Sequence, residues 1–406
     1  MDSIKIGSML PFGSASRVDA QEFRNGARLA IDEINTLGGI NGRKLKLVCV
    51  DSGDQSAGAV VAAARRLINE HGVHAIINGY NMGSHNAEYD VIADAGIIYI
   101  HSNTTIQHHD TIASDPHRYF GCLMGNPADY WYGQGFIKFI SWLRDTGQWR
   151  PDSNRLAIIS GSRPYSIVIA NAMKSAAKEF GWVTAFGPEI VDTPTKEWRN
   201  VLDRARAVEP SILVNTHFYA HDLAHFQNQF LQDPFRCLVY LQYGGMHKSF
   251  GDIVGKRAEG VLIGTVVGLL QDESGKAFAH KYMKCFGELS TPEVGCLTYS
   301  SVRHYGAAAA IAGGTGAPFD PTEQNRKVAE VLVTMPFRSV VGTINYHPSP
   351  GVPPSPIRTI RLIPRSVCRT CFTNCSIKAK NAPSSRRSLI VHLGFDCRAG
   401  FERANV

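Results

Sequence analysis

The sequence predicts an α/β protein with two doubly wound parallel-sheet lobes. Apolar runs of strand length alternate with amphipathic helical segments, which is the pattern of repeated strand–helix–strand units. The alternation breaks once, around residues 119–126, and then begins again. A chain of 406 residues, 44% of them hydrophobic, can bury two cores of ordinary size. We therefore expect two lobes that share one architecture.

The stretch Gly26–Gln55 carries the clearest fold signal. Its apolar residues first recur at helical spacing, Gly38-Gly39 then ends the helix, and Leu45–Val50 is a short apolar run. Such a run is typical of a strand that is covered on both faces of a sheet. Ile4–Leu10 is a similar run before the helix, so we expect a right-handed parallel crossover. The loops after these two strands then lie at the edge where open parallel sheets bind ligands.

The same alternation continues along the chain and sets the expected lobe boundaries. Three helices near residues 274–334 have no strand between them, so they cannot extend a sheet and are expected to return to the first lobe. We expect a first lobe of residues 1–120 plus 270–335, a second lobe of residues 121–269 plus 336–365, and an atypical basic, cysteine-containing tail, 366–406, that is poorly ordered or non-native. The further expected helices are 57–70, 84–95, 131–146, 166–180, 197–207, 222–231, 274–287, 298–312 and 322–334, and the further strands are 75–78, 97–101, 156–160, 185–190, 212–215, 237–241, 260–266 and 340–346.

The charge distribution argues against nucleic acid as a partner. The chain has net charge +7, but residues 366–406 hold seven Lys or Arg and two acids, so residues 1–365 carry only +2. A near-neutral body has no broad basic surface for a polyanion. No apolar run is long enough to span a membrane, and the start, MDSIKIGSMLPF, enters a strand without a signal segment. We therefore expect either a cytoplasmic protein or one whose export signal has been removed.

The cysteines do not form the framework of a secreted disulfide-rich domain. Five of the nine lie in the body and four in the tail. Cys285 and Cys296 are close enough in sequence to bridge in an oxidising compartment, although scattered free thiols are the favoured interpretation. In the tail, the spacing of Cys368, Cys371 and Cys375, with Cys397 as a fourth ligand, leaves a zinc site as the minority alternative.

Three histidines have a spacing that a metal site could use. His217, His221 and His225 are four residues apart, which would align them on one helix face. The expected strand ends at Asn215 and the expected helix begins near Asp222, so the three are not expected to share a helix. We predict no metal site and no cofactor.

The chain resembles the type I periplasmic binding proteins, and in particular the leucine-binding-protein-like subfamily that binds branched-chain amino acids, amides and related solutes for ABC importers. The resemblance spans most of residues 4–346 and implies a Venus-flytrap, in which a multi-strand hinge joins the lobes and a solute is captured in the cleft between them by hinge closure. The matching segments are GARLAIDEINTLGGINGRKLKLVCVDSGD at 26–54, VHAIINGYNMGSHNAEYDVIADAGIIYI at 73–100 and AEGVLIGT at 258–265.

In the first lobe the resemblance implies that hydroxyls and backbone amides hold the polar end of the solute. Met82 and Ser84 lie in the loop after strand 75–78, and Ser84 would also cap the next helix. Asn103 and Thr105 follow the next strand, and Phe12 follows the first. Ordinary turns and helix caps use the same residue types, so their place at strand ends is what favours binding.

In the second lobe aromatic residues follow three strands in succession. Tyr165, Tyr219 and Tyr243 are the expected ligand contacts, because aromatic rings bury apolar ligand surface and stack on cations. Related amino-acid binders place an acid in this lobe against the ligand's ammonium. Here Asp222 is the nearest acid and could be a helix cap instead, which favours a neutral or aromatic solute.

These observations predict a solute-binding protein and not an enzyme. The chain lacks the G-x-G-x-x-G, G-x-S-x-G and H-E-x-x-H motifs. We expect the periplasmic component of an ABC importer that takes a small polar solute to a membrane permease, acts as a monomer or weak dimer, and binds no nucleic acid. The alternatives are a cytoplasmic amide-type sensor on the same fold and, less favoured, a doubly wound enzyme without a recognisable motif.

Overall fold

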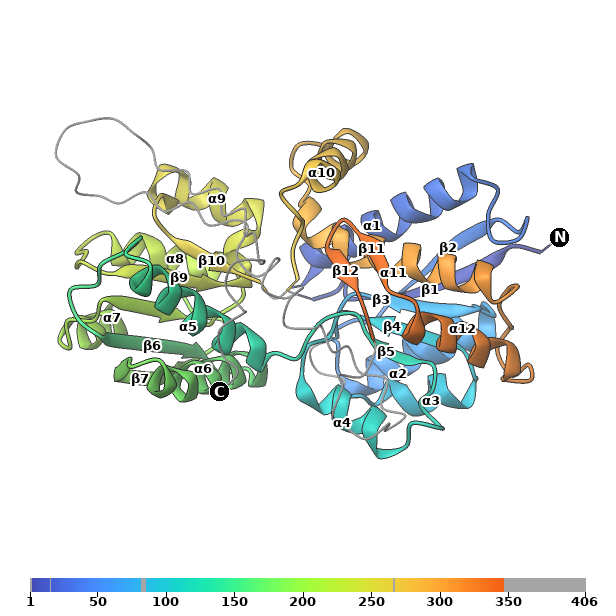
Figure 1. The fold of residues 1–406 in the computed structure, drawn as a ribbon, viewed down its shortest axis with the longest axis horizontal. Coiled ribbons are helices and arrows are strands. Elements are labelled where there is room, and N and C mark those ends of the chain that lie inside the picture. Colours follow the sequence, from blue (N-terminus) through green and yellow to red (C-terminus); the bar gives the residue numbers. More distant parts are fainter. Residues whose placement is uncertain (1, 15, 82–84, 266, 347–406) are drawn as a thin grey trace, which may run out of the picture. The chain divides into compact units, whose positions relative to one another are not determined.

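The computed structural model describes residues 2–14, 16–81, 85–265 and 267–346, which form two compact units (Figure 1). The first unit contains residues 2–128 and 267–346, and the second contains residues 129–265. Each unit has its own parallel five-stranded sheet with helices on both faces. The two doubly wound sheets that the sequence predicts are therefore present.

The sheet of the first unit has the strand order β2-β1-β3-β4-β5. Its strands are β1 (Ile4–Leu10), β2 (Leu45–Asp51), β3 (Ala75–Asn78), β4 (Ile98–His101) and β5 (Cys122–Met124). β1 and β2 pair in parallel from Ile4 opposite Leu45 to Leu10 opposite Asp51, as the crossover in the sequence predicts. Every residue of β3 and β4 is buried, because helices cover both faces of the sheet.

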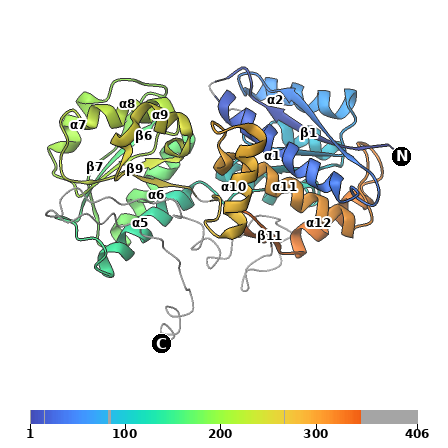
Figure 2. The same ribbon diagram turned by 90° about the horizontal axis from the view of Figure 1, so that it is seen from above.

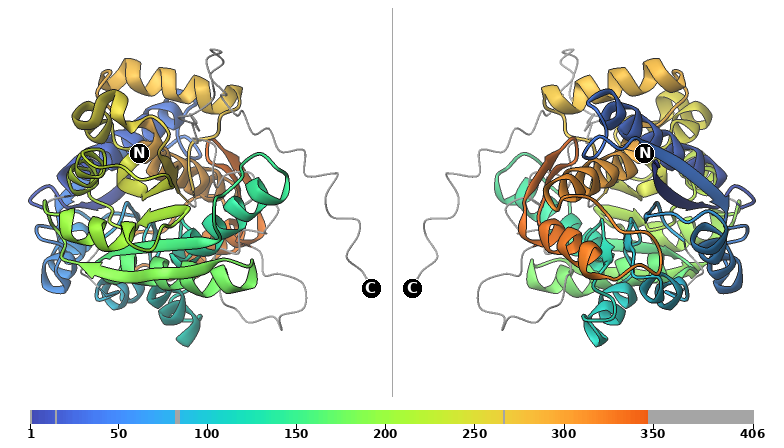
Figure 3. Two further views of the ribbon diagram at one scale, coloured as in Figure 1. Left: turned by 90° about the vertical axis from the view of Figure 1, so that its left-hand side faces the viewer. Right: turned by 90° about the vertical axis from the view of Figure 1, so that its right-hand side faces the viewer.

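The helices of the first unit come from both parts of its chain. The amino-terminal part supplies α1 (Arg17–Thr36), α2 (Ala57–Arg65) continued by the π-helical turn η1 (Arg66–Glu70), α3 (Glu88–Asp94) and α4 (Ile106–Ser114), and the later part supplies α10 (Glu273–Phe286), α11 (Pro292–Ile311) and α12 (Glu323–Thr334). α11 lies beside α1 (Figure 3). Their backbones meet closely at Gly26, where an added Cβ would lie 1.9 Å from the carbonyl oxygen of Gly295. This glycine is therefore required by helix packing.

The sheet of the second unit has the order β10-β9-β8-β6-β7, and the side chains of β6 alternate between two cores. Leu156 and Ile158 pack toward α5 and α6, whereas Ala157 and Ile159 pack toward α7, α8 and α9. Figure 2 shows these two groups of helices on either side of the sheet. The strands are β6 (Arg155–Gly161), β7 (Val183–Val191), β8 (Ile212–Asn215), β9 (Leu238–Gln242) and β10 (Leu262–Gly264). The helices are α5 (Tyr130–Asp145), α6 (Pro164–Glu179), α7 (Arg199–Arg206), α8 (Ala220–Phe230), η2 (Tyr243–Met246), α9 (Lys248–Val254) and η3 (Gly255–Ala258).

The unit boundaries differ from the expected lobe boundaries at three places, the shortest of which is residues 267–269, which belong to the first unit. Residues 121–128 belong to the first unit, because β5 pairs with β4 there. The antiparallel hairpin of β11 (Phe337–Ser339) and β12 (Gly342–Ile344) also belongs to it, because Ser339 donates a 2.7 Å hydrogen bond to Ser300 of α11. We had expected residues 336–365 in the second lobe. Residues 347–365 and the 366–406 tail lie outside the described residues.

Two further expectations can be compared with the fold. Cys285 is exposed on α10 and Cys296 is buried in α11, and both are free thiols. Within residues 2–346, apart from the gaps given above, no helix combines the length and apolarity needed to cross a membrane.

Candidate functional site

The carboxyl ends of β3, β4 and β5 bring three polar loops together in the first unit. These strands are neighbours in the sheet and run parallel, so the loops that follow them share one edge. The N–H of Ser102, after β4, donates a 2.8 Å hydrogen bond to the carbonyl of Gly79, after β3. Asn126, after β5, donates from its side-chain Nδ2 to the carbonyl of Ser102 at 3.0 Å. The three loops are thus hydrogen-bonded to one another.

Asn103 is the best-positioned of the residues expected to bind the solute. Its Oδ1 accepts a 2.8 Å hydrogen bond from the backbone N–H of Asn81, and its own N–H donates to Nδ1 of His101 at 3.2 Å. The side chain is buried, yet its Nδ2 has no hydrogen-bond partner among the described residues. A buried donor without a partner costs about 1–3 kcal/mol. A ligand carbonyl or carboxylate oxygen would remove that cost.

The adjacent Asn126 was not identified from the sequence. Its Oδ1 is buried and, within the described part of the chain, has no partner. The β4 and β5 loops therefore present one unpaired donor, on Asn103, and one unpaired acceptor, on Asn126. Its position just after a strand in a parallel sheet is the signal that could have found it.

Asp129 was also missed, and it is the most unusual acid of the described chain. It directly precedes α5 and is fully buried, and neither carboxylate oxygen has a hydrogen-bond partner among the described residues. Burial raises the pKa of its carboxyl from 3.8 to about 7, and the nearby backbone N–H groups of Tyr130 and Asp129 act in the opposite direction. A buried, unpaired carboxylate is costly unless a proton or a cationic group accompanies it.

The other expected contacts of the first unit have different surroundings. Thr105 directly precedes α4 and is half-buried, and its hydroxyl makes no hydrogen bond to the described residues. Phe12 is half-buried after β1, where its N–H donates to Oδ1 of Asp51 at 3.1 Å. The guanidinium of Arg24 lies 5.7 Å from the centre of the Phe12 ring. Met82 and Ser84 lie outside the described residues.

In the second unit, Tyr165 connects the ends of three neighbouring strands. It stands near the start of α6, after β6, and its hydroxyl accepts a 3.0 Å hydrogen bond from Nε2 of Gln242 at the end of β9. Its ring packs edge to face against the ring of Phe218, which follows β8, with the centroids 5.5 Å apart. It packs in the same way against Tyr132, with the centroids 5.8 Å apart. Burial and the neighbouring Tyr132 raise the pKa of Tyr165 well above its ordinary value, so it is a neutral phenol.

Tyr219 and Tyr243 lie on adjacent loops of the same edge. Tyr219 is half-buried, directly precedes α8 and packs on Phe218 at 4.5 Å between centroids. Tyr243 opens η2 with φ +29°, a backbone conformation that non-glycine residues rarely adopt. The next residue must be small, because a Cβ on Gly244 would lie 2.2 Å from the carbonyl oxygen of Phe218. The β8 and β9 loops are therefore in direct contact.

Gln242 gives this edge a neutral polar group. It is fully buried, its Oε1 accepts from the hydroxyl of Tyr240 at 2.7 Å, and its Nε2 donates to Tyr165. The amide is thus bound on both sides by tyrosines, and it holds Tyr165 in place.

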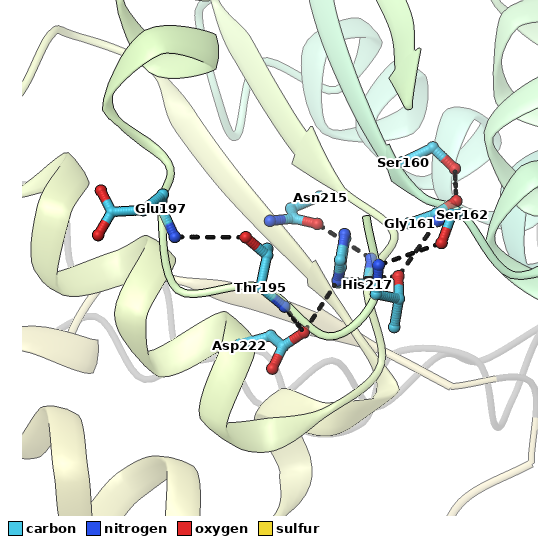
Figure 4. A network of polar contacts seen from close by, with 9 residues as sticks. Ser160, Gly161, Ser162, Thr195, Glu197, Asn215, His217 and Asp222 are labelled. Atoms are coloured by element: carbon cyan, nitrogen blue, oxygen red, sulfur yellow. Dashed lines mark hydrogen bonds and ion pairs between the residues drawn. The ribbon is translucent and has the colours of Figure 1, made fainter. Parts of the chain in front are cut away.

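Asp222 has a structural role inside the second unit (Figure 4). Its Oδ2 accepts a 2.9 Å hydrogen bond from the N–H of Thr195 and lies 3.4 Å from Nδ1 of His217. It is buried, and α8 has no side-chain cap, so the alternative of a helix cap was wrong. This carboxylate holds the loop after β7 instead.

The same network does not form a hydrolytic relay. Oγ1 of Thr193 lies 3.5 Å from Nδ1 of His217, which is also the nitrogen that faces Asp222. A relay needs the hydroxyl and the carboxylate on opposite ring nitrogens. Here the His217 and Trp198 rings pack edge to face with their centroids 4.7 Å apart, and Nε2 of His217 has no hydrogen-bond partner in the described part of the chain.

The three spaced histidines are arranged as the sequence predicts. His217 lies in the loop before α8, whereas His221 and His225 lie on that helix. Among the described residues, no three His, Cys, Asp or Glu side chains are grouped closely enough to hold a metal ion.

Comparison with known proteins gives consistent matches over nearly the whole described chain. A family model described as periplasmic binding protein matches residues 3–363. A crystal structure assigned to a branched-chain amino acid ABC transporter of Silicibacter pomeroyi is 40% identical, has a TM-score of 0.83, and is matched over 91% of this chain and 92% of its own.

More distant relatives share the fold or part of the sequence. The branched-chain amino acid transporter substrate-binding protein of Streptococcus pneumoniae, solved with isoleucine, is 16% identical with a TM-score of 0.69, and the match covers 88% of this chain and 93% of that one. The Leu/Ile/Val-binding protein homolog 7 of Brucella abortus is 34% identical over 96 residues. That match covers 24% of this chain and 24% of the relative, about a quarter of its length.

Proposed function

This chain belongs to the periplasmic binding protein family, and we propose on that basis that it is the extracytoplasmic solute-binding component of an ABC importer. Its family and structural neighbours are solute-binding proteins and not enzymes. The proposal extends this general role to periplasmic capture of a small solute and its delivery to a membrane permease. Its support is the 40% identical structure assigned to such a transporter.

The observation that carries the proposal is the set of buried, unpaired polar groups after β4 and β5. In the first unit, Asn103 offers an amide donor and Asn126 an amide acceptor, each without a partner among the described residues. Buried polar groups are almost always hydrogen-bonded in folded proteins. A solute that brings an acceptor and a donor would satisfy both.

We infer that the solute is a small amino acid or amide. Thr105 and Phe12 would complete its contacts in the first unit, and Met82 and Ser84 remain proposed contacts there. In the second unit, Tyr165, Tyr219 and Tyr243 would cover its apolar part and fix the size that the site accepts. Asp129 supplies the acid that the sequence had offered only at Asp222, so an amino group is favoured over a wholly neutral solute.

The same proposal includes the protein's partners. We infer that closure on the solute is followed by docking to the permease as a monomer or weak dimer. A solute that binds only the folded protein raises its thermal midpoint by mass action. The protein should therefore be stabilised by one chemical class from a panel of amino acids, amides, ureas and aromatic acids, and mass spectrometry of the purified protein should find a solute of that class. Failure of every solute to stabilise it, together with turnover of a substrate, would overturn the proposal.

A further inference from the structure

A separate cavity lies at the opposite edge of the first unit's sheet. Its volume is about 510 Å³, and its charged and titratable lining consists of Asp2, Lys5, Arg43, His74 and Asp320. Asp2, Arg43 and His74 lie just before β1, β2 and β3, and Lys5 lies near the start of β1. The cavity is therefore at the amino ends of the strands, whereas the proposed solute contacts are at the carboxyl ends. Its volume is within the usual range of small-molecule sites, about 300–1,000 Å³.

The hydrogen bonds of His74 determine where its proton is. The side chain is buried, with 9% of its surface exposed. Its Nδ1 lies 3.2 Å from the backbone nitrogen of Lys5, and a backbone N–H can only donate. Nδ1 must therefore accept and carries no proton. A neutral imidazole has one N–H, so His74 carries it on Nε2.

The proton on Nε2 faces a second donor. Nη2 of Arg43 lies 3.2 Å from Nε2 of His74, and a guanidinium has donors but no acceptor. Two donor groups thus lie next to each other, and neither can accept a hydrogen bond from the other. Arg43 is held in this position because its Nε donates to the backbone carbonyl of Asp2 at 3.1 Å.

The charges around this pair are mixed. Burial lowers the pKa of His74, Arg43 and Lys5 lower it further, and Asp320 and Asp2 act in the opposite direction. The Nζ of Lys5 donates to the carbonyl of His71 at 2.6 Å, and the carboxylate of Asp320 accepts from the N–H of Ala317 at 2.9 Å. Because the two acids offset the two cations, a multiply charged anion is disfavoured.

We propose that this cavity is a second ligand site, which binds a small monocarboxylate beside His74 and Arg43. One carboxylate oxygen accepts from Nε2–H of His74, and the other accepts from an N–H of Arg43. The two oxygens of one planar anion match two adjacent donors, and charge-assisted hydrogen bonds are stronger than neutral ones. The site is independent of the proposed solute contacts.

Acetate is the probe that tests this site, read out by the ring nitrogen signals of His74 in NMR. The signals are assigned by their loss in His74→Gln, and they should show the Nε2–H tautomer. Sodium acetate should shift them saturably, whereas sodium chloride at equal ionic strength should not, and phosphate should act more weakly. Arg43→Met should weaken the acetate response by about tenfold or more, because a charge-assisted bond is lost.

Matched variants separate this site from general charge effects and from the solute site. Arg28→Met removes the same charge from an exposed guanidinium that does not line the cavity, and the response should be unchanged. Asn103→Asp should also leave it unchanged. Acetate should raise the pKa of His74, and its affinity should accordingly rise as pH falls. An equal response to chloride, an unchanged response in Arg43→Met, or no saturable shift would overturn the proposal.

Discussion

The starts of α5 and α8 each carry a buried aspartate, and the two acids have opposite surroundings. Asp222, in the first turn of α8, accepts from the N–H of Thr195 and faces His217. Asp129, before α5, has no hydrogen-bond partner among the described residues. Burial is similar, so the difference lies in the partners alone. A buried acid with internal partners stabilises the fold, whereas one without them is available to a ligand and destabilises the fold until the ligand binds.

The largest expected effect is the pH dependence caused by Asp129. Its pKa is about 7 in the folded protein against 3.8 ordinarily, so the folded state holds an extra proton between these values. Stability from this group is therefore complete below about pH 4 and is lost as pH rises to about 7, by up to about 4 kcal/mol. In Asp129→Asn this loss should be absent. Urea unfolding of both proteins from pH 4 to 8 measures it.

This prediction is decided by how the unfolding free energies of Asp129→Asn and of the parent protein change with pH. The difference in unfolding free energy between Asp129→Asn and the parent protein should grow with pH and level off above about pH 7. A difference that stays constant across this range would show that Asp129 is already compensated. The same variant should lose affinity for the solute.

A smaller, opposite effect is expected for Asp222. Asp222→Ala leaves the N–H of Thr195 without its acceptor and removes the carboxylate that faces Nδ1 of His217. We expect a loss of about 2–4 kcal/mol in unfolding free energy at pH 7, measured by urea titration. Asp222→Asn, whose Oδ1 can still accept from Thr195, should lose less. If both variants were as stable as the parent protein, the structural role given to Asp222 would be wrong.

A substitution of Asn103 tests the unpaired side-chain donor and disturbs the fold less than the substitutions of Asp222 do. Asn103→Asp keeps an oxygen to accept from Asn81 but replaces the unpaired Nδ2 with oxygen. We expect solute affinity to fall by about tenfold or more, because a donor is exchanged for a negative charge. Calorimetric titration measures the affinity, and the thermal midpoint without solute serves as the control. Unchanged affinity would remove Asn103 from the site.

The smallest effect is expected for the hydroxyl of Tyr165. Tyr165→Phe removes the acceptor for Gln242 but keeps the ring against Phe218, so affinity should fall by only about threefold. Tyr165→Ala removes the ring as well and should cost about tenfold. Equal losses in the two variants would show that the ring itself makes no contact with the solute.

Local patterns were sufficient for most of the secondary structure. β1, β2 and the helix between them followed from apolar spacing and from Gly38-Gly39, and the later strands followed from similar short runs. β5 and α4 were missed, because three residues are too few to show periodicity and Ile106–Ser114 is polar over most of its length. The β11–β12 hairpin was expected in the second lobe because its contact with α11 is not encoded locally.

The residues of the candidate site also divide into those that local sequence patterns reveal and those that they do not. Asn103, Thr105 and Tyr165 could be selected from the sequence, because a position after a parallel strand is a local property. Asn126 has such a position too, but the three-residue strand before it was missed, and nothing in NPAD shows that the oxygens of Asn126 and Asp129 are buried without partners. The role of Asp222 depends on Thr195, which is 27 residues away.

By itself, the sequence determined the two parallel-sheet lobes and the family resemblance, because apolar periodicity and the glycine-ended helix of residues 26–55 are set by neighbours along the chain. Only the tertiary structure decided which polar groups are paired. Asp222 accepts a hydrogen bond from Thr195, whereas Nδ2 of Asn103 has no partner among the described residues. Both facts depend on segments that are distant in the sequence and are brought together by folding. The two facing N–H groups of His74 and Arg43 arise in the same way, since 31 residues separate them.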